Sequence, residues 1–232
     1  MGNLVIVKCG TTMPALAAQV GDFEDWIVAT LGHRSQDAVI WDARSDPNPP
    51  HADAIIITGS HDPLTDETPW MARTTAWVKD IIDAGIPTLG ICFGHQMIAA
   101  ALGGIVGENP RGAEVGTTNI RLTSAARRDA LFSGLTDELR VHTAHYHTIL
   151  ELPEGVTVLA ENAMDPYHAV RYRDNVWGVQ FHPEMRPEIA AAYKQELRHM
   201  LPRRLSGNGR LMNMFQQLDE GVVVLQRFAT LA

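Results

Sequence analysis

The sequence feature that most constrains the fold is the stretch Thr88-Leu-Gly-Ile-Cys-Phe-Gly-His-Gln96. Its first four residues are mostly apolar and bounded by β-branched side chains, which is typical of a short buried strand in a parallel sheet. The Ala-rich run from Gln96 to Leu102, followed by Gly103 and Gly104, indicates a helix and its end. A strand that turns directly into a helix predicts an α/β architecture.

Cys92 lies at the junction of this strand and helix, and Gly90 and Gly94 flank it at two residues on either side. Small residues at these positions are the pattern of a nucleophile elbow, in which the chain doubles back and leaves no room for neighbouring side chains. The positive end of the helix would favour the thiolate over the thiol. The competing interpretation of this motif alone is a buried structural cysteine.

A second motif changes that balance. The apolar run from Val176 ends in His182-Pro183-Glu184, where we expect Pro183 to hold His182 extended. In an extended segment His182 and Glu184 project to the same side, so that the carboxylate can orient the imidazole and the imidazole can serve a thiol. Together with Cys92, these residues predict a Cys-His-Glu triad.

The motifs Gly90-Ile-Cys-Phe-Gly-His-Gln96 and Gly178-Val-Gln-Phe-His-Pro-Glu184 resemble those of class I (triad-type) glutamine amidotransferases, in particular the glutaminase domain of GMP synthase and its free-standing relatives. The resemblance covers roughly residues 3 to 200. It implies a flavodoxin-like, three-layer fold with a mainly parallel open sheet, helices on both faces and antiparallel edge strands. We expect one domain over residues 1–232, with a core at about 3–200 and a C-terminal helical extension at 203–232.

The function that the resemblance implies is hydrolysis of the side-chain amide of glutamine through a thioester on Cys92, without a cofactor. No P-loop motif is present, so the ammonia would go to an unknown acceptor or to a separate synthetase. An alternative is a stand-alone γ-glutamyl peptidase or hydrolase that acts on γ-glutamyl amides. A non-catalytic binding or regulatory module is the alternative from another class, and the intact Cys92, His182 and Glu184 argue against it.

Strand and helix patterns alternate in the first part of the chain, which predicts a parallel sheet with helices on both faces. We expect strands at 4–9, 38–42, 53–58 and 88–91, and helices at 14–20, 22–31 and 69–84. Asp22 is a predicted N-cap, and Pro69 is expected at the first helical position after Thr68. Ligands of such sheets bind at the carboxyl ends of the strands, where Thr58, Cys92 and His182 fall.

The pattern changes after Gly104. Alternating segments at 115–123, 139–142, 157–161 and 169–173 predict antiparallel strands on a parallel core. We expect a short helix at 125–135 and an amphipathic helix at 187–200. The tail carries apolar residues at helical spacing. Packing on the domain's own surface is the favoured interpretation, and contact with a homodimer or another partner is the alternative. These tail residues are Leu211, Met214, Phe215, Leu218, Val222, Leu225 and Phe228.

The resemblance also implies an oxyanion hole, in which backbone N–H groups stabilise the negative charge of the tetrahedral intermediate. Phe93, which follows the nucleophile, supplies one donor by position. The other donor falls on Gly59 or Ser60, because Gly-Ser-His stands here where much of the family has Gly-Gly-Pro. Which of these two amides points inward stays open.

His142, His145 and His147 invite a metal interpretation, but no carboxylate or cysteine joins them locally in the sequence, and we predict no metal site. The segment Ala144-His-Tyr-His-Thr-Ile149 resembles the family's Ser-His-Gly-Asp segment, whose backbone holds the two ends of glutamine, with His147 in place of the usual Asp. In a second register, Tyr146-His-Thr148 resembles the Tyr-His-Ser of anthranilate-synthase-type amidotransferases. This resemblance implies substrate binding by His145, Tyr146 and His147, and the family position of Gln96 implies the same role.

Net charge, hydrophobic stretches and cysteine content limit the classes of partner and the location that we expect for the chain. The net charge of −8 argues against nucleic acid, and no stretch is long and apolar enough to span a membrane. Cys9 and Cys92 do not make a disulfide framework, so a reducing, cytoplasmic location is expected. The expected partners are glutamine or another γ-glutamyl small molecule, with a synthetase subunit or a second copy of the chain as the macromolecular alternatives.

Overall fold

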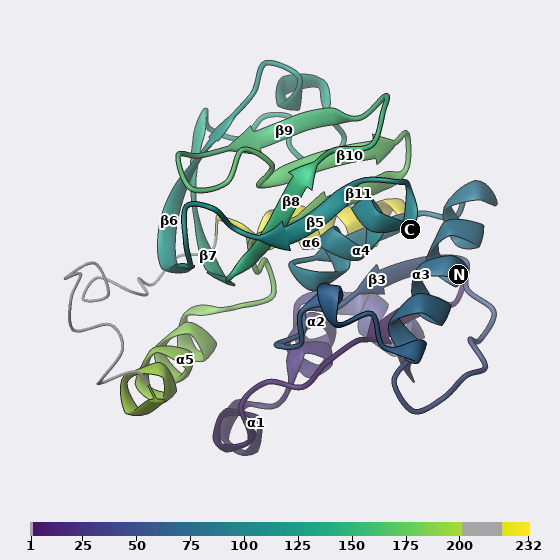
Figure 1. The fold of residues 1–232 in the computed structure, drawn as a ribbon, viewed down its shortest axis with the longest axis horizontal. Coiled ribbons are helices and arrows are strands. Elements are labelled where there is room, and N and C mark those ends of the chain that lie inside the picture. The colour runs from purple at the N-terminus through teal and green to yellow at the C-terminus, as the bar shows by residue number, and fades with distance from the viewer. Residues whose placement is uncertain (1, 201–219) are drawn as a thin grey trace.

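A central nine-stranded sheet organises the computed structural model, which describes residues 2–200 and 220–232 (Figure 1). Its strand order is β2-β1-β3-β4-β11-β10-β9-β6-β7, and β5 and β8 form a separate antiparallel pair. The first five strands in this order are parallel: β2 (Ala38–Asp42), β1 (Leu4–Lys8), β3 (Ala54–Ile57), β4 (Thr88–Ile91) and β11 (Val176–Val179). The remaining strands pair antiparallel: β10 (Ala169–Arg173), β9 (Thr157–Glu161), β6 (Glu114–Leu122), β7 (Glu138–His145), β5 (Ile105–Glu108) and β8 (His147–Glu151).

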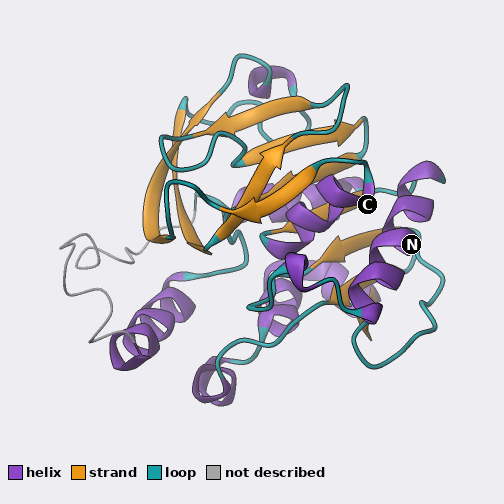
Figure 2. Ribbon diagram, in the orientation of Figure 1, coloured by secondary structure: helices purple, strands orange, loops and turns teal. Residues whose placement is uncertain are grey.

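Helices cover both faces of the parallel half, so the predicted three-layer α/β class is confirmed (Figure 2). Two helices pack on one face: α2 (Phe23–Thr30) and α6 (Val222–Leu231). Two others pack on the opposite face: α3 (Pro69–Asp83) and α4 (Phe93–Ala101). The helices α1 (Pro14–Val20) and α5 (Pro187–Met200) lie against each other beside the sheet.

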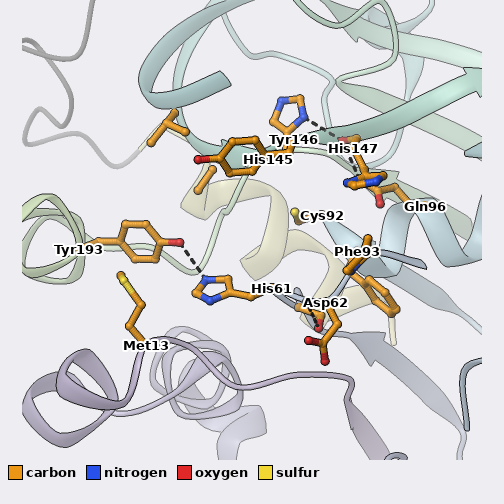
Figure 3. A pocket seen from close by; sticks show the side chains of 14 residues that line it. Met13, His61, Asp62, Cys92, Phe93, Gln96, His145, Tyr146, His147 and Tyr193 are labelled. Atoms are coloured by element: carbon orange, nitrogen blue, oxygen red, sulfur yellow. Dashed lines mark hydrogen bonds between the residues drawn. The ribbon is translucent and has the colours of Figure 1, made fainter. Parts of the chain in front are cut away.

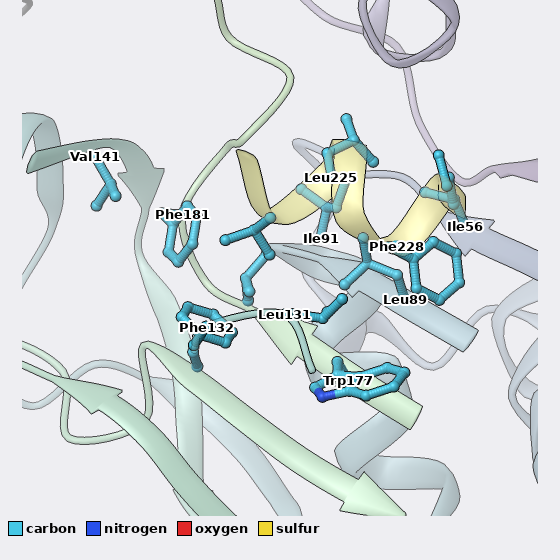
Figure 4. Packing of buried hydrophobic residues seen from close by; sticks show 14 of the residues in the cluster. Ile56, Leu89, Ile91, Leu131, Phe132, Val141, Trp177, Phe181, Leu225 and Phe228 are labelled. Atoms are coloured by element: carbon cyan, nitrogen blue, oxygen red, sulfur yellow. The ribbon is translucent and has the colours of Figure 1, made fainter. Parts of the chain in front are cut away.

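The alternation of side chains along β1 explains why the sheet needs two helical layers. Leu4 and Ile6 face the α2/α6 layer, and Val5 and Val7 face the α3/α4 layer; all four are fully buried. Figure 4 shows the first of these layers, in which the last helix packs Leu225 and Phe228 over the strand that leads to Cys92. The tail helix therefore packs on the chain's own core, while Leu211, Met214, Phe215 and Leu218 lie outside the described residues.

Local sequence signals place the helix ends as expected. Asp22 caps α2 in a capping box with Asp25, and Pro69 is the first residue of α3. The helix expected at 69–84 is confirmed, and Gly85 follows its C-cap with a φ of +75°. None of the helices in residues 2–200 and 220–232 is long and apolar enough to cross a membrane.

Two local predictions are wrong. The helix expected at 125–135 is only a 3-10 turn, Ala126–Arg128, because the buried carboxylate of Asp129 accepts hydrogen bonds from the backbone of Leu131 and from the Trp177 indole. The strand expected to run into His182 ends at Val179, and the N–H of Met185 donates to the His182 carbonyl. His182 therefore begins a turn, where an extended segment was expected.

Candidate active site

Cys92 lies at a strained junction between β4 and α4. Its φ of 51° and ψ of −102° fall outside the regions that a residue with a side chain normally occupies. Both flanking glycines are required by close approach: a Cβ on Gly90 would lie 2.4 Å from the Gly94 carbonyl oxygen, and one on Gly94 would lie 2.4 Å from the Ile57 carbonyl oxygen. This geometry is that of a nucleophile elbow, as the spacing predicts.

His182 and Glu184 meet through the turn that follows β11. Nδ1 of His182 lies 2.7 Å from Oε1 of Glu184, and both side chains are buried. This contact occupies one ring nitrogen, so the other is left to serve Cys92, whose charge acts on the imidazole. Two different local conformations, extended or turn, thus give the same pairing of His182 with Glu184.

Electrostatics favour the charged imidazole. Burial alone would lower the pKa of His182, but the negative charges of Glu184 and Cys92 and the hydrogen bonds to both raise it to about 10. The ring of Phe23 stacks on the imidazole with a centroid separation of 6.0 Å. A nearby imidazole responds in the opposite direction: burial and the charge of His182 lower the pKa of His142 to about 4.

Gln180 is a site residue that the sequence analysis missed. Its Nε2 donates to Sγ of Cys92 over 3.4 Å, and its Oε1 accepts a hydrogen bond from Nε2 of Gln96 over 3.1 Å. The same Gln96 nitrogen donates to the carbonyl oxygen of His147 over 2.9 Å. Gln180 stands inside the quoted motif, two residues before His182, which was the available signal.

A cavity of about 380 Å³ opens above Cys92 (Figure 3). The predicted site residues Ser60, Phe93, Gln96, His145, Tyr146 and His147 all line it together with Cys92. Gly59 lies close to Cys92 and His182 as well, since a Cβ there would lie 3.1 Å from Cε1 of His182 and 3.8 Å from Cβ of Cys92. The structure thus brings the predicted oxyanion and substrate residues to one place.

One wall of the cavity comes from elements that the motifs did not indicate. Oη of Tyr193, on α5, lies 3.0 Å from Nε2 of His61, which follows β3 (Figure 3). Met13 lies beside this pair. These residues join the two helices beside the sheet to the loop that carries Gly59 and Ser60, and no local sequence signal connects segments so far apart.

The three histidines of the 142–147 segment do not form one cluster. His145 instead meets two buried residues from other parts of the chain, Glu114 and His168, and these three could hold a metal ion by their arrangement. The carboxylate missing from the local sequence is therefore supplied by β6. The ring of His142 lies against Thr117, and that of His147 faces the cavity.

An open, mainly parallel α/β sheet with a cysteine elbow at the carboxyl end of a central strand, and a His-Glu pair at the end of the next, defines a class of nucleophile-elbow proteins. Residues 19–197 match the family model for glutamine amidotransferase class-I, which covers more than half of the chain. The chain belongs to this family.

Individual relatives agree with this assignment. The chain is 34% identical over 137 residues to a GMP synthase [glutamine-hydrolyzing] subunit of Saccharolobus solfataricus, a match that covers 58% of this chain and 68% of that protein. It is 32% identical over 139 residues to gamma-glutamyl peptidase 4 of Arabidopsis thaliana, covering 59% and 55%. It spans about a quarter of the length of the full GMP synthases that it also matches.

The fold is shared with a solved glutamine amidotransferase from Thermotoga maritima. The two structures superpose with a TM-score of 0.75 over 98% of this chain and 96% of that one, at 19% sequence identity. This likeness shows the fold, and the flavodoxin-like arrangement expected from the sequence is confirmed.

Proposed function

We propose that the chain hydrolyses the γ-amide of glutamine through a thioester on Cys92, with His182 as general acid and base and Glu184 as the group that orients His182. The observation that carries this proposal is the strained elbow at Cys92 beside the 2.7 Å pair of His182 and Glu184. A nucleophile on an elbow, a base in reach and a third group that orients the base are the arrangement that covalent acyl transfer needs.

In the proposed reaction the Cys92 sulfur attacks the amide carbon while His182 holds the thiol proton. The tetrahedral intermediate collapses when His182 gives this proton to the leaving nitrogen, so ammonia departs and a γ-glutamyl thioester remains. His182 then takes a proton from water, the resulting hydroxide attacks the thioester, and glutamate leaves as the thiol is restored. The high pKa of His182 suits the acid step, because the imidazole is protonated when the amine departs.

The oxyanion hole is proposed to use the Phe93 amide and an amide of Gly59 or Ser60. Phe93 is the first residue of α4, so its N–H lies at the helix N-terminus directly after the nucleophile. The closeness of Gly59 to His182 and Cys92 and the position of Ser60 on the cavity support the second donor.

Gln96 is the proposed contact for the amino end of the substrate. Its side-chain nitrogen is used within the protein, by the His147 carbonyl and by Gln180. Its Oε1 is therefore the atom suited to receive an ammonium group. Tyr146 and His147, which line the cavity beside Gln96, are proposed to enclose the rest of the glutamyl group, with His145 supporting them.

A second candidate function is hydrolysis of γ-glutamyl amides that carry a leaving group larger than ammonia. The cavity supports it, because a volume of about 380 Å³ with Met13, Val115, Ala144 and Tyr193 in its walls offers an apolar space beyond the reacting atoms. The similarity to a gamma-glutamyl peptidase points in the same direction. A synthetase that accepts the ammonia is the partner proposed for the first function, by analogy with the GMP synthase subunit of Saccharolobus solfataricus.

The test is mass spectrometry of the intact protein after reaction with the glutamine-like electrophile 6-diazo-5-oxo-norleucine, followed by peptide mapping. The expected result is one adduct on Cys92, blocked by glutamine, absent in Cys92→Ala and present in Cys9→Ala. Cys9 is a matched control, since it is buried at the end of β1 and burial raises the pKa of its thiol. Failure of the folded protein to react at Cys92 would refute glutamine recognition.

A panel of glutamine and γ-glutamyl anilides or peptides then separates the two candidates. Faster release from glutamine supports the amidotransferase, and faster release from the larger amides supports the γ-glutamyl hydrolase. Cys92→Ala must abolish both activities, because both proceed through the same thioester.

A further inference from the structure

Behind the cavity wall, Glu114 of β6, His145 of β7 and His168, which precedes β10, form a buried polar group that we call the Glu114 cluster. Oε2 of Glu114 lies 3.1 Å from Nε2 of His145 and 2.9 Å from Nε2 of His168. Its other oxygen, Oε1, accepts a hydrogen bond from Nδ2 of Asn162 over 2.7 Å. The reaction proposed above uses neither Glu114 nor His168.

The neighbours of His145 fix its protons. Nδ1 lies 3.0 Å from the His147 carbonyl oxygen, which can only accept, so Nδ1 must carry a hydrogen. Nε2 faces a carboxylate oxygen, where a second hydrogen is needed for a bond. Both ring nitrogens of His145 thus face oxygen acceptors, Nδ1 the His147 carbonyl and Nε2 the Glu114 carboxylate.

His168 completes the cluster without adding charge. Its Nε2–H donates to the same oxygen of Glu114, and its Nδ1 has no hydrogen-bond partner among the described residues. The neutral tautomer with one hydrogen accounts for both facts. Burial alone would raise the pKa of the Glu114 carboxyl, but the hydrogen bonds from His145 and His168 hold this pKa well below its usual range.

A chain of contacts leads from this charge to the nucleophile. The His147 carbonyl that receives the hydrogen of His145 also receives one from Gln96. Gln96 in turn bonds to Gln180, and Gln180 bonds to Sγ of Cys92. The corner between β7 and β8, at Tyr146 and His147, is therefore held in place from behind by His145 and from the side by Gln96.

We infer that Glu114 is a positioning residue of the substrate pocket: its carboxylate keeps His145 doubly protonated, and His145 in turn fixes the Tyr146–His147 corner against Gln96. The inference rests on the proposed function, because it assigns the corner to glutamyl binding. Glu114 itself is not among the described residues that line the cavity.

A proton explains the cluster better than a metal ion. The separations of 2.9 and 3.1 Å between the imidazole nitrogens and the carboxylate oxygen are those of direct hydrogen bonds. Ligands of a tetrahedral zinc ion each lie about 2.0–2.2 Å from the metal, which places the donor atoms roughly 3.3–3.6 Å apart. Metal analysis of the purified protein checks this point, and one equivalent of zinc that Glu114→Gln loses would overturn the inference.

The decisive variant is Glu114→Gln, which keeps the shape but removes the negative charge. A neutral His145 carries one ring hydrogen, so it can no longer donate both to residue 114 and to the His147 carbonyl. The corner should then move. We expect labelling of Cys92 by 6-diazo-5-oxo-norleucine to slow about tenfold or more, the loss that corresponds to one hydrogen bond of a charged group.

The rate at which iodoacetamide alkylates Cys92 distinguishes a local change of the pocket from a general folding defect, because a folding defect would change this rate as well. Iodoacetamide alkylates a cysteine without recognition of a glutamyl group, so its rate on Cys92 should stay within about twofold in Glu114→Gln. Asp129→Asn is the matched control, because Asp129 is a similarly buried carboxylate that bonds Trp177 and Leu131 away from the cavity. Both labelling rates should be unchanged there.

A spectroscopic measurement separates failure of this inference from failure of the proposed function. Nitrogen-15 NMR of the histidine rings at neutral pH should show His145 with hydrogens on both nitrogens in the wild type and on one nitrogen in Glu114→Gln. A protein that ignores the glutamine analogue refutes the proposed function and leaves this readout usable. A singly protonated His145 in the wild type, or unchanged analogue labelling in Glu114→Gln, refutes the positioning role.

Discussion

Replacing Gly94 with alanine tests whether the close approach of α4 to β3 places the nucleophile. The added Cβ would lie 2.4 Å from the Ile57 carbonyl oxygen and 2.8 Å from the Ile57 Cβ, whereas ordinary contact begins at 3.4 Å. The backbone of Ile57 lies inside the sheet and cannot yield as a flexible side chain would. The start of α4 must therefore retreat by about 1 Å.

That shift has two consequences. Overpacking in a closed core costs about 1–3 kcal/mol of unfolding free energy. The start of α4 carries the Phe93 amide, which directly follows Cys92 in the chain, so the same movement would displace the proposed oxyanion donor relative to the sulfur. A misplacement of about 1 Å at reacting groups costs roughly a hundredfold in rate, and we expect kcat/KM of Gly94→Ala to fall by about that factor.

The assay is glutamate or amine release on whichever γ-glutamyl compound proves the best substrate, with the unfolding free energy from urea titration. Ala100→Gly is the matched control: it lies in the last turn of the same helix, and glycine there lowers stability by up to about 1 kcal/mol without a new contact at the elbow. It should lose stability and keep kcat/KM. If Gly94→Ala retains kcat/KM within about threefold of the wild type, the claim that the β3–α4 approach sets the nucleophile is wrong.

Three further predictions concern the His-Glu pair and the core. Glu184→Gln should lower kcat by about 10²–10⁴-fold, since the imidazole loses its orienting charge, and steady-state kinetics with a circular-dichroism check of folding measures it. Folding raises the pKa of His182 from 6.5 to about 10, so the charged His182 stabilises the fold fully below pH 6.5. Urea titrations should show this contribution to the unfolding free energy disappearing as the pH rises toward 10. Equal pH profiles of the unfolding free energy for the wild type and His182→Gln would contradict this prediction. Phe228→Ala should cost about 3–5 kcal/mol of unfolding free energy, because Phe228 is fully buried against Trp177. Leu231→Ala, at a half-exposed position of the same helix, should cost under about 1 kcal/mol. Similar losses for the two variants would place α6 outside the core.

The parts of the structure that the sequence predicted are those whose cause is local. Gly90 and Gly94 predict the elbow because no side chain larger than hydrogen fits at these positions. Asp22 and Pro69 predict helix starts because they act on the conformation of the next few residues. The error at 125–135 has the opposite origin. Asp129 is drawn out of a helix by Trp177, 48 positions away, and no local pattern reports such a partner.

The site residues that the sequence did not predict have partners far away in the chain. Glu114 meets His145 across a separation of 31 positions and His168 across 54, and Tyr193 meets His61 across 132. The motif around Cys92 and His182 could be recognised because each half is continuous in sequence. The family resemblance also pointed to His145, Tyr146 and His147, whereas Glu114 and His168 could not be recognised, since they meet His145 only when β6, β7 and the segment before β10 come together.

The sheet itself explains how these two halves act on one substrate. β11 is the strand at which the sheet changes direction, since it runs parallel to β4 and antiparallel to β10. Its carboxyl end carries Gln180, which bonds to Cys92 on the parallel side and to Gln96, and Gln96 bonds to the His147 corner on the antiparallel side. Cys92 and the Tyr146–His147 corner are therefore both linked to the same strand end. Met13, which precedes α1, and Tyr193, on α5, instead reach the cavity from the helices beside the sheet. Under the proposed function, changes in those two residues would reshape the space for a leaving group at a distance from the sheet, and we expect the choice between glutamine and a larger γ-glutamyl amide to depend on them.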